Sequence, residues 1–106
     1  MEIPSKTERP TVADKELAVF TNPICPFAHR VMMAAVEKLG KDGFRAIYVQ
    51  LGEGKPAWYG EVYDKKTVPS IQYGDYTMGE SIDCVKWLDK TFKGKGPQLV
   101  LDDQRA

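Results

Sequence analysis

Three hydrophobic patterns follow one another in the first half of the chain, and their order constrains the fold more than any other feature. Residues 17–20 form a short apolar run, which is typical of a buried strand. Over residues 28–39 the apolar side chains recur at helical spacing, with Pro26 suited to the first turn and Gly40 to the end. Residues 44–49 then alternate as a second strand. This order predicts a right-handed βαβ unit.

The second half of the chain predicts a loop, a hairpin and another helix. Residues 50–66 contain three glycines and a proline, which indicates a loop with one short helix. Residues 70–78 read as two strands around a turn, and a helix is expected from Ser81 to about Phe92. Together these elements predict an α/β fold with a mixed sheet. The apolar residues expected to face inward are Ala28, Val31, Met32, Ala35, Val36 and Leu39 in the first helix and Ile82, Val85 and Leu88 in the second.

Length and charge indicate a single domain without a broad electrostatic partner. The chain has 106 residues, with 15 basic and 15 acidic side chains and a formal net charge of zero. This balance argues against nucleic acid or an anionic membrane as the main partner. Residues 1–14 are polar and show no period, so they predict a flexible N-terminal arm. We expect the folded domain over residues 15–102 and a tail over residues 103–106.

The cysteine content limits the possible chemistry. Two cysteines and one histidine are too few for a structural zinc site within one chain, so no metal site is predicted. Cys25 and Cys84 could form one disulfide by count, but no secretory leader opens the sequence. We therefore expect reduced thiols in a cytoplasmic protein. Cys84 stands among apolar positions of the second helix, which favours a packed core thiol.

Cys25 stands directly before Pro26, at the expected start of the first helix. The free amides and the dipole of a first helical turn stabilise a thiolate, and Arg30 adds a positive charge one turn on. Cysteine is also among the most buried residue types, so the residues alone leave a structural role open. Position 28 is alanine, so the motif lacks the second cysteine of a redox pair. A reactive Cys25 would therefore form a mixed disulfide with a small thiol, which a second small thiol resolves.

Two later segments could hold such a small thiol. A cis Val68-Pro69 bond would turn the Val68 backbone toward the cysteine, where it could pair with an extended peptide. Most bonds before proline are trans, so the residues alone favour the trans form. Glu80 and Ser81 open the second helix, where the amides could bind a carboxylate and Glu80 an ammonium. An ordinary helix cap also explains these two residues, and the residues alone favour the cap over a ligand site.

Four motifs in this order resemble the N-terminal domain of glutathione transferases. They are "CPFAHR", "KPAWY", "TVPSI" and "GESIDCVKWLD", and the resemblance covers roughly residues 16–102. They are most similar to the omega and lambda classes, which carry a cysteine where other classes use tyrosine or serine. The resemblance implies a thioredoxin-like domain with a mixed four-stranded sheet and a cis Val68-Pro69 bond. It also implies glutaredoxin-like thiol transfer: reduction of glutathione mixed disulfides and of dehydroascorbate.

The resemblance assigns roles to individual residues, with glutathione as the co-substrate. Cys25 would be the nucleophile, and glutathionylated proteins or small disulfides would be its other substrates. The residues implied to bind glutathione are Phe27 beside the tripeptide, Lys55 at its glycine carboxylate, Val68 with Pro69 at its cysteinyl backbone, and Glu80 with Ser81 at its γ-glutamyl head group.

Two departures from the family pattern shape the expectations. Family members carry an all-helical C-terminal domain, and this sequence ends near where the linker to it should begin, so we expect that domain to be absent. The uncovered face would then favour self-association. His29 stands where these classes often have glutamine or glutamate, and an exposed helix side chain is the favoured interpretation.

Two other functions compete with the enzyme. One is a domain that binds glutathione without catalysis, or a fragment that is inactive without its helical partner. The other is membrane insertion, as in the chloride intracellular channel proteins, through the first helix and second strand. Seven charged or titratable side chains between residues 29 and 45 make that segment too polar, so no stable insertion is expected.

Overall fold

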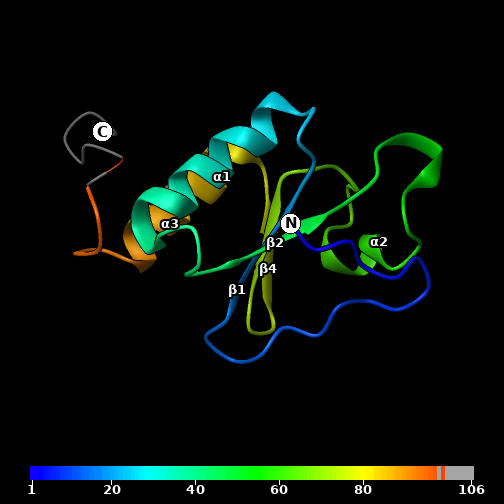
Figure 1. The fold of residues 1–106 in the computed structure, drawn as a ribbon, viewed down its shortest axis with the longest axis horizontal. Helices are drawn as coiled ribbons and strands as arrows, with labels where there is room; N and C mark the ends of the chain where they lie inside the picture. The colour runs from blue at the N-terminus through cyan, green and yellow to red at the C-terminus, as the bar shows by residue number, and fades with distance from the viewer. Residues whose placement is uncertain (98, 100–106) are drawn as a thin grey trace.

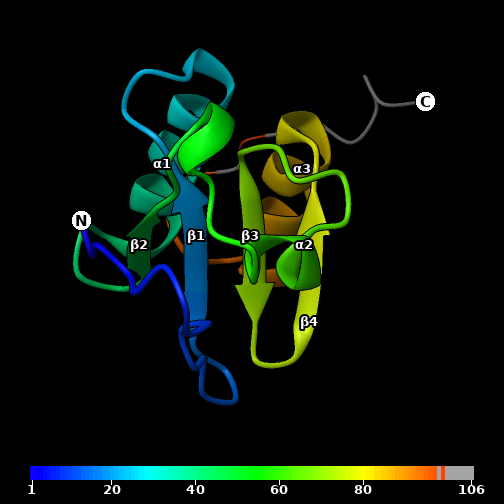
Figure 2. The same cartoon turned by 90° about the vertical axis from the view of Figure 1, so that its right-hand side faces the viewer.

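The computed structural model describes residues 1–97 and 99 of the chain. At its centre lies a four-stranded sheet with the order β2-β1-β3-β4, seen face-on in Figure 2. The elements are β1 (Leu17–Thr21), α1 (Pro26–Leu39), β2 (Arg45–Tyr48), the 3-10 turn η1 (Gly52–Gly54), α2 (Tyr59–Val62), β3 (Ser70–Tyr73), β4 (Tyr76–Gly79) and α3 (Ser81–Thr91).

The strand pairing confirms the predicted βαβ unit and hairpin. β1 runs parallel to β2, with α1 as the crossover between them. β3 is antiparallel to both β1 and β4, so the sheet is mixed. Gly74 takes a φ of +61° in the turn between β3 and β4, a conformation that glycine adopts without steric cost.

The sheet separates two layers of helix. Figure 1 shows α1 and α3 on one side of the sheet and α2 on the other. Successive side chains of β1 point to opposite faces of the sheet, as the two-residue period of a strand requires. Ala18 and Phe20 pack in the cluster that contains Trp58 and Tyr59. The cluster on the other side consists of Leu17, Val19, Val31, Ala34, Ala35, Ile71, Cys84 and Leu88.

The inward face of α1 differs from the prediction at three positions, since Ala34 and Lys38 are buried and Val36 is not. Val36 was expected to face inward, but it is 41% exposed, whereas Lys38 is buried. α3 packs alongside α1, and the Lys38 ammonium lies 2.7 Å from the Asp89 carboxylate of α3. A buried ammonium needs such a partner, and its long stem covers apolar surface. The helical period could not show this pairing because Asp89 is distant in sequence.

The inward face of α3 also differs from the prediction. Cys84 and Leu88 are fully buried, one helical turn apart, and Val85 is half-buried. Ile82, which was expected to face inward, is 58% exposed. Two residues along a helix correspond to about 200° of rotation, so a face centred on Cys84 directs Ile82 outward.

The start of the N-terminal arm lies along the outer edge of β2, and its later residues reach Trp58 and β3. Glu2 forms a parallel bridge with β2: its amide donates to the Ala46 carbonyl at 2.7 Å, and its carbonyl accepts from Tyr48 at 2.8 Å. Arg45 forms an ion pair with the Glu2 carboxylate at 2.8 Å. The predicted flexibility of residues 1–14 stays a prediction, but these contacts give the arm a defined position. The predicted tail, residues 103–106, falls outside the described residues.

Two negative observations complete the description of the fold. Over residues 1–97 and 99, no helix is both long enough and apolar enough to cross a membrane. Within the same part of the chain, no three side chains of histidine, cysteine, aspartate or glutamate gather in a way that could hold a metal ion.

Candidate functional site

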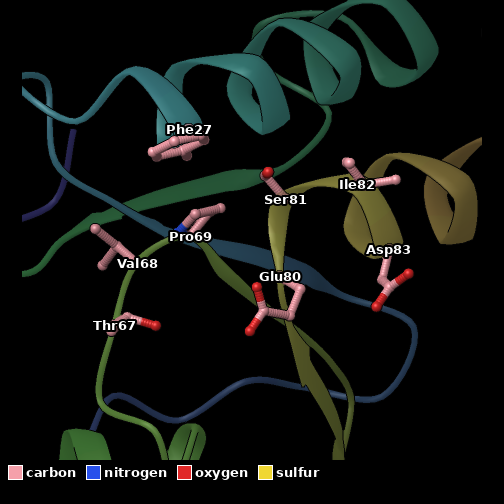
Figure 3. Close-up of a pocket in the computed structure, with 8 residues that line it drawn as sticks. All are labelled: Phe27, Thr67, Val68, Pro69, Glu80, Ser81, Ile82 and Asp83. Carbon is pink, nitrogen blue, oxygen red and sulfur yellow. The ribbon is translucent and has the colours of Figure 1, made fainter.

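A cleft opens where the segment before β3 and the start of α3 face the first turn of α1. Its volume is about 660 Å³. Figure 3 shows the side chains around it, which come from three separate parts of the chain. The lining residues are Phe27, Thr67, Val68, Pro69, Glu80, Ser81, Ile82 and Asp83.

Cys25 lies beside this cleft as the N-cap residue of α1. Its backbone is extended, with φ −82° and ψ 116°, and Pro26 begins the helix. Asn22 shapes the approach: its side-chain oxygen accepts from the Ile24 amide at 3.0 Å, and its amide group donates to the Val49 carbonyl at 3.0 Å. The half-buried Cys25 thiol points at the Val68 carbonyl, 3.9 Å from Sγ. The thiol therefore faces one wall of the cleft.

Val68 and Pro69 form that wall. The bond between them is cis, as the resemblance implied. Val68 is 8% exposed, and Ser70 directly after Pro69 begins β3. Among the described residues, no backbone hydrogen bond uses the Val68 amide. An extended ligand could therefore pair with the backbone of this segment, as an added strand would.

Glu80 and Ser81 form the opposite wall. Glu80 takes φ +71°, a left-handed conformation that is costly for a residue with a side chain and that clusters at binding sites. Figure 3 shows its carboxylate at the cleft, with the Ser81 hydroxyl on the same wall. The Tyr63 hydroxyl donates to Glu80 Oε1 at 3.0 Å and the Lys65 ammonium at 3.3 Å. These two partners lower the pKa of Glu80 below its ordinary 4.5, so the carboxylate is charged at neutral pH.

The cleft brings together most of the residues predicted from the sequence. Phe27, Val68, Pro69, Glu80 and Ser81 all line it. Cys25 is not among the lining residues, but its thiol lies 3.9 Å from the carbonyl oxygen of Val68, which is. Lys55 is not among the lining residues, because its ammonium donates to the Lys66 carbonyl. The predicted role of Lys55 at a ligand carboxylate stays a prediction.

Several residues of the site escaped the sequence interpretation. Thr67, Ile82 and Asp83 line the cleft, while Tyr63 and Lys65 hold Glu80. The segment before Thr67 has no periodic hydrophobic pattern, so the sequence did not indicate which residues it contacts in the fold. The sequence did contain a signal for Ile82. It stands two residues before Cys84, so a core-facing side of the helix centred on that cysteine directs Ile82 away from the core.

The second cysteine, the single histidine and two aromatic residues, Trp58 and Tyr59, are not among the residues that line the cleft. Cys84 is fully buried, and this burial raises the pKa of its thiol to about 12. The prediction of a packed core thiol is confirmed. His29 is exposed on α1, as its favoured interpretation required. Trp58 and Tyr59 pack against Phe20 of the sheet, with ring centroids 6.1 and 5.8 Å away.

The arrangement suits an extended ligand with three different recognition groups. The start of α3 offers amides to a carboxylate, and Glu80 offers its charge to an ammonium. The Val68 segment offers backbone groups to the middle of such a ligand. The Cys25 thiol lies at the Val68 end of this arrangement, and thiol–disulfide exchange there would require a ligand that brings a sulfur of its own to Cys25.

The sequence of this region matches a known family. Residues 24–91 match the family described as "Glutathione S-transferase, N-terminal domain". The chain belongs to this family. Among its relatives is "Glutathione S-transferase L3" of Arabidopsis thaliana, 35% identical over 98 residues that cover 92% of this chain and 40% of the relative. Another is "Protein IN2-1 homolog A" of Oryza sativa subsp. japonica, 36% identical over 93% of this chain and 40% of the relative.

Solved structures of the family share the fold. Glutathione transferase Omega 2C from Trametes versicolor superposes with a TM-score of 0.68 at 28% identity, covering 74% of this chain and 38% of that one. Omega 3C from the same organism gives a TM-score of 0.74 over 88% of this chain and 41% of that one; at 22% identity this likeness concerns the fold alone. The thioredoxin-like fold and the likeness to the lambda and omega classes are confirmed. The chain spans about two fifths of the length of these relatives.

Proposed function

We propose that this protein is a glutathione-dependent thiol transferase in which Cys25 is the sole catalytic thiol. Membership of the glutathione S-transferase family supports a function that involves glutathione. The observation that carries the finer proposal is the position of the Cys25 thiol, 3.9 Å from the Val68 carbonyl at the cleft. Cys84, the other cysteine of the chain, is fully buried and could not take this role.

The reaction follows from a single reactive thiol. The Cys25 thiolate attacks the glutathionyl sulfur of a mixed disulfide, a Cys25–glutathione disulfide forms, and the other thiol leaves as a thiolate that takes up a proton. A second glutathione thiolate then attacks the glutathionyl sulfur on Cys25, which releases oxidised glutathione and restores Cys25. In each cycle one mixed disulfide is reduced and one free glutathione thiol is oxidised, and both glutathionyl groups leave together as one molecule of oxidised glutathione.

The protein's residues would bind glutathione along the cleft. Glu80 and the start of α3 suit the γ-glutamyl ammonium and carboxylate, and the Val68 backbone suits the cysteinyl residue. Phe27, 57% exposed at the first turn of α1, would lie beside the tripeptide. Glutathionylated proteins, small disulfides and dehydroascorbate are the proposed second substrates. A reducing compartment such as the cytoplasm would supply the glutathione that the cycle consumes.

A turnover assay tests this proposal. The protein receives hydroxyethyl disulfide and reduced glutathione, and glutathione reductase reports oxidised glutathione through NADPH consumption. We expect a rate above the uncatalysed one, loss of that rate in Cys25→Ser, and its retention in Cys84→Ala. A Cys25→Ser variant as active as the parent would overturn the proposal.

The second candidate is a domain that binds glutathione without turnover. It is favoured by the fact that the chain spans about two fifths of its relatives' length, while the lining of the cleft comes wholly from this part. The turnover assay and a calorimetric binding measurement together distinguish the two. Calorimetric binding of glutathione to the parent chain, without any rate above background, would select the binding domain.

A further inference from the structure

Two tyrosines at the ends of α2 form hydrogen bonds with the two walls of the cleft. Tyr59 begins this helix and Tyr63 caps its end, four residues later, so both project from one side of a single turn. Resting on the proposed function, we infer that Tyr59 and Tyr63 are positioning residues that hold the Val68 wall and the Glu80 wall in the geometry that binds glutathione.

Tyr59 acts on the Val68 wall through a buried hydroxyl. It is fully buried, and its hydroxyl donates to the Thr67 carbonyl at 2.7 Å. A second hydrogen bond of 2.7 Å joins it to the Ser70 hydroxyl. Because the tyrosine has one proton and gives it to Thr67, Ser70 donates in this second bond. Tyr59 is thus hydrogen-bonded to the residue before the Val68-Pro69 pair and to the residue after it.

The bond to Thr67 also fixes the direction of the Val68 amide. The Thr67–Val68 peptide is trans, since the cis bond is the one that follows it. In a planar trans peptide the carbonyl and the amide point in opposite directions. Holding the Thr67 carbonyl toward Tyr59 therefore directs the Val68 amide away from the core, and no described backbone group pairs with it. This amide is the donor that an extended ligand would use.

Tyr63 acts on the opposite wall through its ring and its hydroxyl. Its ring lies so close to Gly79 that a Cβ at that position would come within 2.2 Å of it, so only glycine fits there. Its hydroxyl donates to Oε1 of Glu80, the residue that follows Gly79, at 3.0 Å. Both described partners of this carboxylate, Tyr63 and Lys65, end on Oε1. Among the described residues Oε2 is left for a ligand ammonium.

Both hydroxyls keep their protons at any working pH. Burial raises the pKa of Tyr59 far above its ordinary 10.0. The pKa of Tyr63 is raised as well, first by burial and then by its bond to Glu80. Each tyrosine is therefore a constant donor to its wall, and replacing it with phenylalanine removes the donor while leaving the ring in place.

The test uses hydroxyl deletions in a Cys25→Ser background, so that glutathione binds without forming a disulfide. Calorimetry measures its dissociation constant in Tyr59→Phe, Tyr63→Phe and the parent. The loss of one hydrogen bond predicts a dissociation constant that is larger by roughly three- to ten-fold in each variant. Tyr73→Phe is the control, since this tyrosine lies among Trp87 and Phe92 at the hairpin end of β3.

Ser70→Ala separates positioning from general stability. This variant and Tyr59→Phe both break the bond between the two hydroxyls, but only Tyr59→Phe releases the Thr67 carbonyl. We expect the dissociation constant of Ser70→Ala to stay within about two-fold of the parent value. Equal weakening in both variants would assign Tyr59 a merely structural role and overturn the inference.

A second measurement does not depend on glutathione. Backbone nitrogen relaxation by NMR reports fast motion at single amides. The order parameter of the Val68 amide should fall in Tyr59→Phe and not in Ser70→Ala, and that of Ser81 should fall in Tyr63→Phe. Unchanged order parameters and unchanged dissociation constants overturn the inference and leave the proposed function standing. A parent chain that binds no glutathione overturns the proposed function instead, and the order parameters then decide whether the tyrosines hold the walls.

Discussion

The two cysteines occupy related positions in two helices and have opposite environments. Cys25 caps α1, and Cys84 lies in the first turn of α3. The Cys25 thiol is half-buried and faces the cleft, whereas Cys84 is fully buried beneath α1. Desolvation raises the pKa of Cys84 to about 12, despite its place near a helix start. Proximity to a helix start therefore does not make a thiol reactive by itself; access to water and to a ligand decides.

The largest expected difference between the two cysteines is their rate of alkylation. With iodoacetamide near neutral pH, Cys25 should react more than roughly a hundred-fold faster than Cys84, because alkylation requires an accessible thiolate. Peptide mass spectrometry assigns the modified residue over time. In denaturant the two should react at similar rates, which controls for local sequence. Comparable alkylation rates of Cys25 and Cys84 in the folded protein would contradict the different exposure assigned to the two thiols.

The next effect concerns the wall opposite Cys25. Glu80→Gln keeps an oxygen for the Tyr63 hydroxyl but removes the charge. In a Cys25→Ser background we expect the dissociation constant for glutathione to rise roughly ten-fold, the value of a hydrogen bond to a charged group. Calorimetry measures it, with the exposed Glu53→Gln as the control.

This effect should also depend on pH in a defined direction. The folded pKa of Glu80 is lowered, so its charge is present above 4.5 and is lost only as the pH falls through the lowered value. The advantage of the parent over Glu80→Gln should hold from pH 7 down to about pH 5 and shrink at lower pH. An advantage that disappears above pH 5 would contradict the role given to this carboxylate.

A smaller effect is expected from the loop that carries Cys25. Asn22→Ala removes the hydrogen bonds to the Ile24 amide and the Val49 carbonyl. Asn22 is 3% exposed, so its loss leaves buried polar groups unpaired, and the free energy of unfolding should fall by about 1–3 kcal/mol. Urea denaturation measures this change. Below the transition, Cys84 should stay protected from alkylation while the reactivity of Cys25 changes; exposure of Cys84 would show that the loop is not separate from the core.

The smallest effect belongs to the buried thiol. Cys84→Ala should lower the free energy of unfolding by about 1 kcal/mol at neutral pH, through lost burial and a small cavity. The folded pKa is raised from 9.0 to about 12, so the neutral thiol stabilises the fold below pH 9 and this contribution is lost as the pH rises toward 12. Denaturation at several pH values measures the difference between parent and variant. The stability advantage of the parent over Cys84→Ala should shrink above pH 9, and an advantage that grows there would contradict the burial of Cys84.

Local patterns were sufficient to predict the elements of the fold. The runs at residues 17–20, 28–39 and 44–49 became β1, α1 and β2, and the hairpin turn lies at Gly74. These features depend on neighbours in the sequence. The faces of the helices depend on what packs against them, so Val36 and Ile82 were misplaced and the buried Lys38–Asp89 pair was missed.

The residues of the candidate site also fall into two groups, those that motifs in the sequence identified and those that only the fold revealed. Motifs identified Cys25, Val68 and Glu80, because a recognisable residue type stands at a recognisable boundary. Tyr59 and Tyr63 have no such boundary; their hydroxyls reach the walls only because α2 folds back over the sheet. The contacts of the N-terminal arm with β2 had no signal either, since single backbone bridges leave no periodic pattern.

The central claim is that Cys25 accepts glutathione and Cys84 does not. The most direct measurement incubates the folded protein with oxidised glutathione and locates the adduct by mass spectrometry of intact protein and of peptides. We predict one glutathionyl group per chain, on the peptide that contains Cys25, removed by reduced glutathione and absent in Cys25→Ser. No adduct on the folded protein, or an adduct on Cys84 at an equal rate, would contradict the account.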